Sequence, residues 1–192
     1  MGSFLHRGRP LMTVMIQTSS PAHARSVIYG ASWEGADAFG LQLECLRPED
    51  RSAETLASLY AAADGRPFYV TNYRGRFNEH AGDEELAEGL LRAADSGATL
   101  IDVIGDLYAP AEGQLTTDPA AVERQHRLID ALHEKGCEVL VSSHVMRYEP
   151  AERVLEIALA QKARGADIAK IVTAADTEDE ELENLRTTAL LR

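Results

Sequence analysis

The sequence predicts an α/β fold of the (β/α)8 TIM-barrel type, with about six β-α units present in this chain. Short apolar runs rich in β-branched residues alternate with longer segments of helical period, which indicates repeated β-α units and a parallel sheet. Polar residues recur at the carboxyl ends of the expected strands, as they do around the mouth of a barrel. A doubly wound open sheet also fits such a series, but no Gly-x-Gly-x-x-Gly or Walker sequence follows the first strand.

Each expected strand is a short apolar run, and each interval between strands has room for one helix and two loops. The strands are expected at residues 11–17, 38–44, 68–73, 99–103, 138–142 and 167–172. At or near their carboxyl ends stand the polar residues Gln17, Glu44, Arg74, Asp106, His144 and Lys170. The helices are expected at 22–33, 53–63, 83–96, 119–135 and 150–164, and the acidic run 176–183 opens a sixth as a solvated face.

Proline and glycine mark the ends of these helices. Pro119 and Pro150 each stand at an expected first helical turn, where the missing N–H of proline costs no hydrogen bond. Four helices are followed by a glycine directly before the next strand, as a left-handed C-terminal cap requires: Gly35, Gly97, Gly136 and Gly165. The turn residues therefore support the same element boundaries as the apolar pattern.

Composition and charge narrow the class of protein. With 192 residues, 45% of them hydrophobic and 26% charged, the chain is expected to form one domain, 1–192, with a flexible N-terminal segment at 1–10. Its net charge of −12 argues against nucleic acid as a partner, and no apolar run is long enough to cross a membrane. The opening residues lack the apolar core of a secretion signal, so we expect a cytoplasmic protein. Cys45 and Cys137 form no disulfide framework or zinc spacing; both are expected to be buried apolar residues, and no metal is expected.

Lys170 is the most informative residue for chemistry. It stands in the apolar strand Ile-Ala-Lys-Ile-Val, where burial favours the neutral amine, the nucleophile that forms a Schiff base with a carbonyl carbon. His144 closes the preceding strand, so in a parallel barrel the two residues lie on adjacent strands at the same end. An imine-forming lysine beside an imidazole is the pair needed to move a proton at the carbon next to a ketone. The alternatives are a lysine whose ammonium reaches the barrel mouth or pairs with a carboxylate, and a histidine that caps loop backbone.

Carboxylates and one arginine stand at other strand ends. Asp102 and Asp106 flank a Val-Ile-Gly segment, and either could orient His144; we favour Asp106, because Gly105 lets the backbone turn there. Gln42 and Glu44 alternate on the second strand, and both are expected to face the interior. Arg74 is a candidate anchor for a substrate carboxylate or, alternatively, a salt-bridge partner of Glu44.

These residues resemble the type I 3-dehydroquinate dehydratases, barrel enzymes that dehydrate 3-dehydroquinate to 3-dehydroshikimate in the shikimate pathway. Ser142-Ser143-His144, followed by Gly-Ala-Asp-Ile-Ala-Lys-Ile at 165–171, is similar to the family's histidine and Schiff-base lysine segments. The Thr-Asn-Tyr-Arg run at 71–74 resembles its Thr-x-Arg strand end, and Leu-Ile-Asp-Val at 100–103 resembles its fourth strand. The resemblance implies catalytic roles for Lys170, His144 and Asp106, a small keto acid as substrate, and no metal or organic cofactor. Expected to contact the substrate are Arg74, Glu44, Gln42, Ser142 and Asp102.

The sequence departs from the family pattern in three places. Gln42-Leu43-Glu44 stands where the family has Glu-x-Arg, and Asp106 matches the family's fourth-strand glutamate only through a two-residue insertion. The last two strands of the family, with an Arg and a Gln for the substrate, have no counterpart. We therefore expect a fragment of a barrel of about 250 residues; alternatives are two protomers that complete each other, as a homodimer, and an open sheet whose edge is covered. A Schiff-base aldolase or isomerase and a non-catalytic barrel homologue are the alternative functions.

Overall fold

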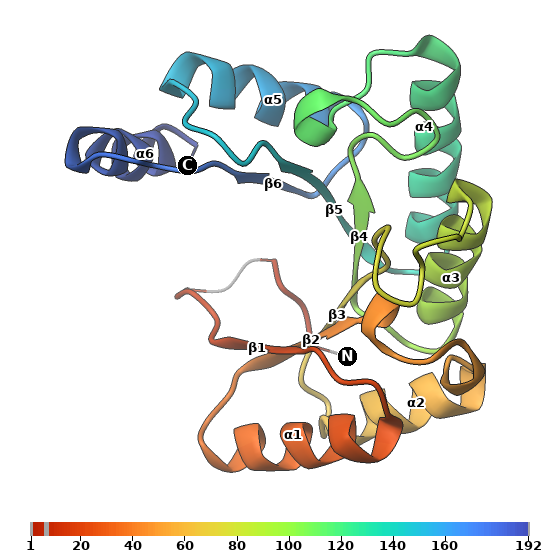
Figure 1. The fold of residues 1–192 in the computed structure, drawn as a ribbon. Helices are drawn as coiled ribbons and strands as arrows, with labels where there is room; N and C mark the ends of the chain where they lie inside the picture. The colour runs from red at the N-terminus through yellow and green to blue at the C-terminus, as the bar shows by residue number, and fades with distance from the viewer. Residues whose placement is uncertain (1, 6–7, 192) are drawn as a thin grey trace. The chain divides into compact units, whose positions relative to one another are not determined.

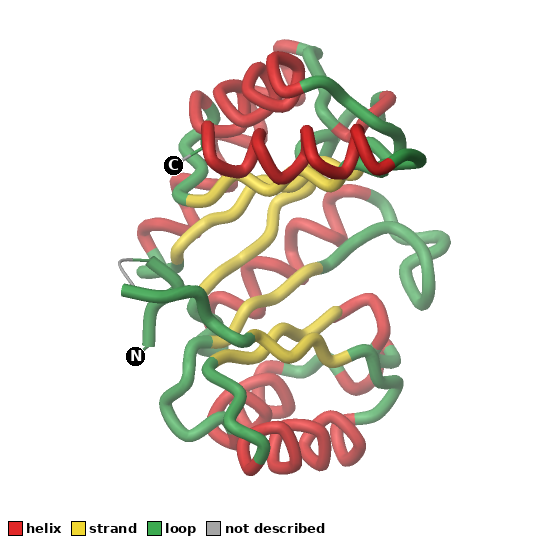
Figure 2. Tube along the Cα trace, turned by 90° about the vertical axis from the view of Figure 1, so that its left-hand side faces the viewer, coloured by secondary structure: helices red, strands yellow, loops and turns green. Residues whose placement is uncertain are grey.

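The computed structural model describes residues 2–5 and 8–191, and within them six strands form one sheet in the order β1-β2-β3-β4-β5-β6. Parallel pairing joins the first to the second strand, the second to the third, the third to the fourth, and the fifth to the sixth. The strands are β1 (Thr13–Ile16), β2 (Ala38–Gln42), β3 (Phe68–Thr71), β4 (Leu100–Ile104), β5 (Glu138–His144) and β6 (Ile168–Val172). Figure 2 shows strands and helices alternating along the trace. The expected α/β fold of TIM-barrel type, with six β-α units, is confirmed.

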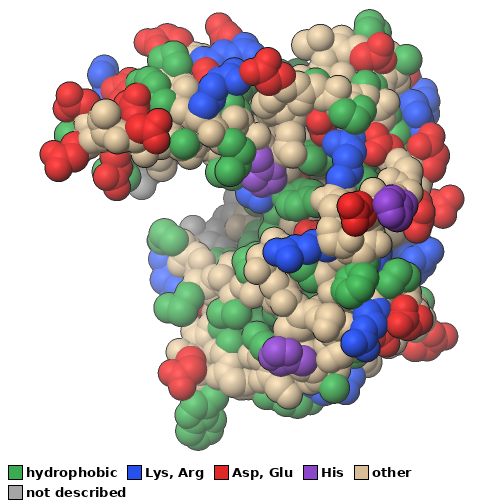
Figure 3. All heavy atoms as spheres, in the orientation of Figure 1, with side chains coloured by type: hydrophobic (Ala, Val, Ile, Leu, Met, Phe, Trp, Pro, Cys, Tyr) green, Lys and Arg blue, Asp and Glu red, His purple; other side chains and the backbone are tan. Residues whose placement is uncertain are grey.

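The helices also lie where the apolar pattern predicts them. They are α1 (Pro21–Trp33), α2 (Ala53–Ala62), α3 (Asp83–Asp95), α4 (Pro119–Glu134), α5 (Ala151–Ala163) and α6 (Glu178–Leu190), with short 3-10 turns at Leu43–Cys45, Pro48–Asp50 and Glu112–Gln114. All four glycines expected as C-terminal caps have positive φ, between 81° and 103°. The acidic run opens α6, where Thr177 and Glu180 form a reciprocal capping box. Acidic side chains gather over this helix in Figure 3, as expected of a solvated face.

The chain divides into two compact units, and the first comprises the residues up to Asp102 together with Ala131–Glu138. In this unit α1 contacts both β1 and α2 (Figure 1). The rings of Phe39 and Phe68 pack with centroids 6.0 Å apart, and Tyr60 lies 4.6 Å from Phe68. These buried rings come from β2, β3 and α2, and they pack the strands of this unit against α2.

The described part of the N-terminal segment 1–10 belongs to this first unit, while residues 1, 6 and 7 of the segment lie outside the described residues. Phe4 donates its backbone N–H to the Glu138 carboxylate at 2.8 Å, and its ring meets Tyr69 edge-on at 6.4 Å. Cys137, in the same unit, is buried as expected, whereas Cys45 is only half-buried because it lies in the turn after β2.

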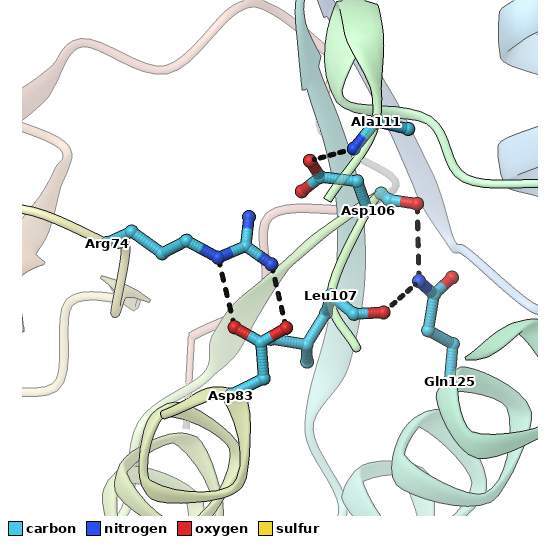
Figure 4. Close-up of polar contacts among 7 residues, drawn as sticks. Arg74, Asp83, Asp106, Leu107, Ala111 and Gln125 are labelled. Carbon is cyan, nitrogen blue, oxygen red and sulfur yellow. Dashed lines mark hydrogen bonds and ion pairs between the residues drawn. The ribbon is translucent and has the colours of Figure 1, made fainter. Parts of the chain in front are cut away.

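The second unit comprises Val103–Asp130 and the residues from Val139 onward. Here β5 pairs with β6, and α5 packs against β6 and α6. A polar network inside the unit holds the loop that follows β4. Gln125 of α4 donates to the backbone oxygens of Gly105 at 3.2 Å and Leu107 at 2.8 Å (Figure 4).

Arg164, which caps α5, completes this network from the other side of the loop. Its guanidinium donates to the backbone oxygens of Gly105 and Thr116 and, at 2.8 Å, to Oε1 of Gln125. The residue is only 6% exposed, and burial lowers the pKa of its guanidinium. All three acceptors are neutral oxygens. The buried charge of Arg164 is therefore stabilised by hydrogen bonds to both ends of the loop after β4, and these bonds hold the two ends together.

Replacing this guanidinium should therefore destabilise the second unit. We expect Arg164→Met to lower the free energy of unfolding by about 3 kcal/mol, because three buried acceptors lose their donor. Urea denaturation followed by circular dichroism measures the change. As a control, Arg127→Met removes the exposed ion pair with Glu123 and should cost no more than about 0.5 kcal/mol. Equal losses for the two variants would contradict the structural role of Arg164.

Candidate active site

The candidate site residues divide between the two units. The second unit contains Lys170, His144, Asp106 and Ser142, and the first contains Gln42, Glu44, Arg74 and Asp102.

Lys170 and His144 project from the same face of the β5–β6 pair. Ser142 lies opposite Lys170 and His144 opposite Val172, and residues paired across parallel strands direct their side chains to the same side. Ser143 must then point to the other side, and it does: its hydroxyl accepts from Nε2 of Gln161 on α5 at 3.0 Å. The face opposite α5 therefore carries Ser142, His144 and Lys170 together.

Lys170 is half-buried, which differs from the burial that its apolar neighbours predict. Every residue of β6 is only partly covered, since β6 is the last strand in the sheet order and has β5 as its one paired neighbour there. The apolar residues around Lys170 therefore belong to a half-buried strand at the edge of the sheet, and not to a fully buried one. The backbone oxygen of Lys170 accepts from Gln161, the same side chain that holds Ser143, at 3.2 Å.

His144 is held by a residue that the sequence did not single out. Oε1 of Gln114 lies 2.6 Å from Nδ1 of the imidazole and accepts the backbone N–H of His144 at 3.1 Å. Gln114 ends the 3-10 turn Glu112–Gln114, in the long loop after β4. No local motif marks it, because it reaches His144 only through the fold of that loop.

Asp106, the expected partner of His144, lies in the same loop and is 3% exposed. Its Oδ2 accepts the backbone N–H of Ala111 at 2.9 Å (Figure 4). This contact stabilises the loop, as the side chain of a turn-forming aspartate does.

In the first unit, Glu44 is nearly fully buried, although β2 ends at Gln42 and Glu44 stands in the following 3-10 turn. Its carboxylate accepts from the Thr71 hydroxyl at 3.1 and 3.2 Å and from the Tyr73 backbone N–H at 3.3 Å. Burial raises the pKa of the Glu44 carboxyl, and the nearby Asp102 carboxylate adds to this rise.

Asp102 is also buried, and two tyrosine side chains contact its carboxylate. The hydroxyls of Tyr69 and Tyr73 both donate to its Oδ2. Burial and the adjacent carboxylate raise the pKa of Tyr69, so this phenol remains a donor. Where the family resemblance has a Glu and an Arg, this chain therefore has Gln42 and a buried acid, Glu44, with a second buried acid, Asp102, nearby.

Arg74, the expected anion anchor, is engaged with Asp83 at the start of α3. Its Nε and Nη2 donate to the two carboxylate oxygens at 2.9 and 2.8 Å, a bidentate pair (Figure 4). The ion-pair partner observed for Arg74 is therefore Asp83, whereas the salt-bridge alternative named Glu44.

A hollow of about 500 Å³ lies at the carboxyl ends of β1, β2 and β3, lined among others by Gln17, His23, Cys45 and Arg76. In the described part of the chain, no three His, Cys, Asp or Glu side chains are grouped so that they could hold a metal ion. Nor, among residues 2–5 and 8–191, is any helix long and apolar enough to cross a membrane.

Comparison with protein families gives one match: the model described as type I 3-dehydroquinase covers residues 12–191. No curated protein matches the chain. Among solved structures, a 3-dehydroquinate dehydratase from Geobacillus kaustophilus HTA426 is similar with a TM-score of 0.77 and 17% identity, over 96% of this chain and 69% of that one.

Two further solved structures give the same result. A type I 3-dehydroquinate dehydratase from Clostridium difficile has a TM-score of 0.78 and 18% identity, over 95% of this chain and 70% of that one. A 3-dehydroquinate dehydratase from Enterococcus faecalis has a TM-score of 0.78 and 16% identity, over 96% of this chain and 75% of that one. At this identity the likeness concerns the fold.

The buried Glu44 predicts a pH dependence of stability. Its pKa is raised in the folded state, so above the unfolded value of about 4.3 the folded chain binds more protons than the unfolded one, and stability falls as pH rises. Glu44→Gln carries no such proton. We expect the variant to gain stability relative to the unmodified protein between about pH 4 and pH 8, measured by urea denaturation. The exposed control Glu79→Gln should show no comparable trend; a Glu44→Gln difference independent of pH would contradict the raised pKa.

Proposed function

The chain belongs to the type I 3-dehydroquinase family, and from this premise we propose that it is a lyase that dehydrates a cyclic keto acid, 3-dehydroquinate to 3-dehydroshikimate, through a Schiff base. Lys170 forms the Schiff base and His144 is the general acid and base. The substrate is a small molecule, and the reaction needs no metal or organic cofactor, because the lysine imine itself accepts the electron pair.

One observation carries the proposal: Lys170 and His144 share the face of β5 and β6 that lies opposite α5. Their strands are hydrogen-bonded neighbours, with Ser142 directly across from Lys170. An imine formed on Lys170 therefore lies next to an imidazole and a serine hydroxyl, and no other element of the second unit needs to supply the proton-transfer group.

The reaction begins at the nitrogen of Lys170. The neutral amine attacks the C3 ketone, and loss of water from the carbinolamine gives a protonated imine. This cation acidifies the hydrogen on C2, because the electrons of the C–H bond pass into the imine as an enamine forms. His144 takes that proton.

Elimination and hydrolysis complete the cycle. The enamine returns its electrons and expels the C1 hydroxyl, which leaves as water with the proton held by His144. Water then adds to the conjugated imine, and the carbinolamine collapses to release the enone product and the amine of Lys170. Protons and electrons balance without any external oxidant or reductant.

Of the remaining candidate residues, Asp106 has a catalytic role and the others bind substrate. Ser142 is placed next to the imine, and Asp106 acts on His144 indirectly, because it stabilises the loop after β4 that also carries Gln114. In the first unit, Gln42, Glu44 and Asp102 offer hydrogen-bonding groups to the hydroxyls of the substrate. Arg74 binds the substrate carboxylate by exchanging it for the carboxylate of Asp83, which has the same bidentate geometry.

We further propose a cytoplasmic homodimer without nucleic-acid or membrane partners, in line with the net charge of −12. A second candidate function is a Schiff-base aldolase or isomerase that keeps Lys170 and His144 but takes another carbonyl compound. The buried Glu44 favours this candidate, since an acid stands where the family pattern has an arginine.

Reductive trapping separates the candidates. We expect borohydride with 3-dehydroquinate to add the reduced substrate to the peptide that contains Lys170 and to neither of the peptides that contain the other lysines, Lys135 and Lys162. Mass spectrometry of the digest measures this. Trapping only with other carbonyl compounds would favour the aldolase or isomerase, and no trapping with any candidate would favour a non-catalytic barrel homologue.

Substitution of the two principal residues should have different consequences. Lys170→Ala abolishes turnover because no imine forms, whereas His144→Ala slows turnover by roughly 100-fold or more and still allows trapping. Formation of the enone, followed by its ultraviolet absorbance, measures the rates. Lys135→Ala, which removes only an ion pair with Asp95, is the matched control. Appreciable turnover by Lys170→Ala would refute the assignment.

A further inference from the structure

We infer that Gln114 is the positioning residue of His144: its side-chain oxygen holds the neutral imidazole in the tautomer with the proton on Nδ1 and leaves Nε2 as the nitrogen that exchanges protons with substrate. The catalytic consequence rests on the proposed function, but the tautomer does not.

The direction of the Gln114 amide follows from the backbone. The N–H of His144 points at one atom of the amide at 3.1 Å, and a backbone N–H can only donate. That atom must therefore be the oxygen, because the amide nitrogen would place two donors against each other.

The tautomer follows from the direction of the amide. The same oxygen lies 2.6 Å from Nδ1, and an amide oxygen can only accept. Nδ1 therefore carries the hydrogen, and in the neutral ring Nε2 has the lone pair. A general base needs that lone pair on the nitrogen directed at the substrate.

The loop that carries Gln114 is fixed by main-chain contacts that are independent of its side chain. Gly113 and Gln114 both have positive φ, 69° and 53°. The backbone oxygen of Gln114 accepts from the Ser143 hydroxyl at 2.9 Å, and its N–H donates to Ala111 at 3.1 Å. Gly105 makes this approach possible, since a Cβ there would lie 2.6 Å from the Gln114 backbone oxygen.

Because these anchors are backbone groups, a substitution of the Gln114 side chain leaves them in place and changes only the two contacts of the amide oxygen, with Nδ1 and with the backbone N–H of His144. Gln114→Met keeps the length of the side chain and removes the acceptor. Gln114→Glu keeps an oxygen at the same place. Glu112→Gln lies in the same turn, where Glu112 is exposed and pairs with Arg147, and serves as the matched control.

The experiment reads the tautomer directly by ¹⁵N–¹H correlation of histidine-labelled protein at about pH 9, where an imidazole of ordinary pKa near 6.5 is neutral. We expect the unmodified protein, Gln114→Glu and Glu112→Gln to show His144 with a protonated Nδ1. Gln114→Met should show a mixture of tautomers. A predominant Nε2–H form in the unmodified protein overturns the inference, and this result needs no variant to fold.

Kinetics supply the second readout. We expect Gln114→Met to lower kcat by about 10- to 100-fold with little change in KM, and Glu112→Gln to leave both unchanged. Trapping of substrate on Lys170 should persist in Gln114→Met. If His144 of the unmodified protein carries its proton on Nδ1 but Lys170 traps no substrate, the proposed function fails and the inference stands. If Lys170 traps substrate but His144 carries its proton on Nε2, only the inference fails.

Discussion

A buried guanidinium holds together the part of the molecule on which the proposed chemistry depends. Arg164 donates to the backbone on both sides of the loop that follows β4, at Gly105 and Thr116, and this loop brings Gln114 to His144. The same helix, α5, carries Gln161, which bonds to Ser143 and to the backbone of Lys170. One helix therefore fixes both the loop and the two strands of the candidate site.

The first unit has a different chemical character. Glu44 and Asp102 are buried carboxylates whose partners are hydroxyls and a backbone N–H, and Arg74 is neutralised by Asp83. In the proposed function, these buried acids bind the hydroxyls of the substrate, and the bidentate position of Asp83 on Arg74 takes the substrate carboxylate. The first unit therefore has one proposed set of residues for hydroxyl groups and another for the anion.

The sequence predicted the fold well because the signals were local. Apolar alternation and glycines with positive φ placed each strand and helix within a few residues. The burial of Lys170 was harder to predict, because its apolar neighbours gave no sign that β6 would pair with a single strand. Gln114 was missed because its role arises from a loop whose path depends on contacts distant in sequence. Only carboxylates were considered as partners of His144, and Asp106 was favoured over Asp102 because Gly105 lets the backbone turn there.

The tight packing at Gly105 couples this residue to Gln114, since a Cβ at Gly105 would lie 2.6 Å from the Gln114 backbone oxygen. Any side chain at residue 105 would displace the backbone carbonyl of Gln114. The side-chain amide of Gln114 would then move away from His144. In the proposed function, a methyl group added at the base of the loop would thus slow proton exchange at His144 without touching Lys170. The shape of the backbone, as much as the identity of the reactive groups, sets which mutations this protein can tolerate.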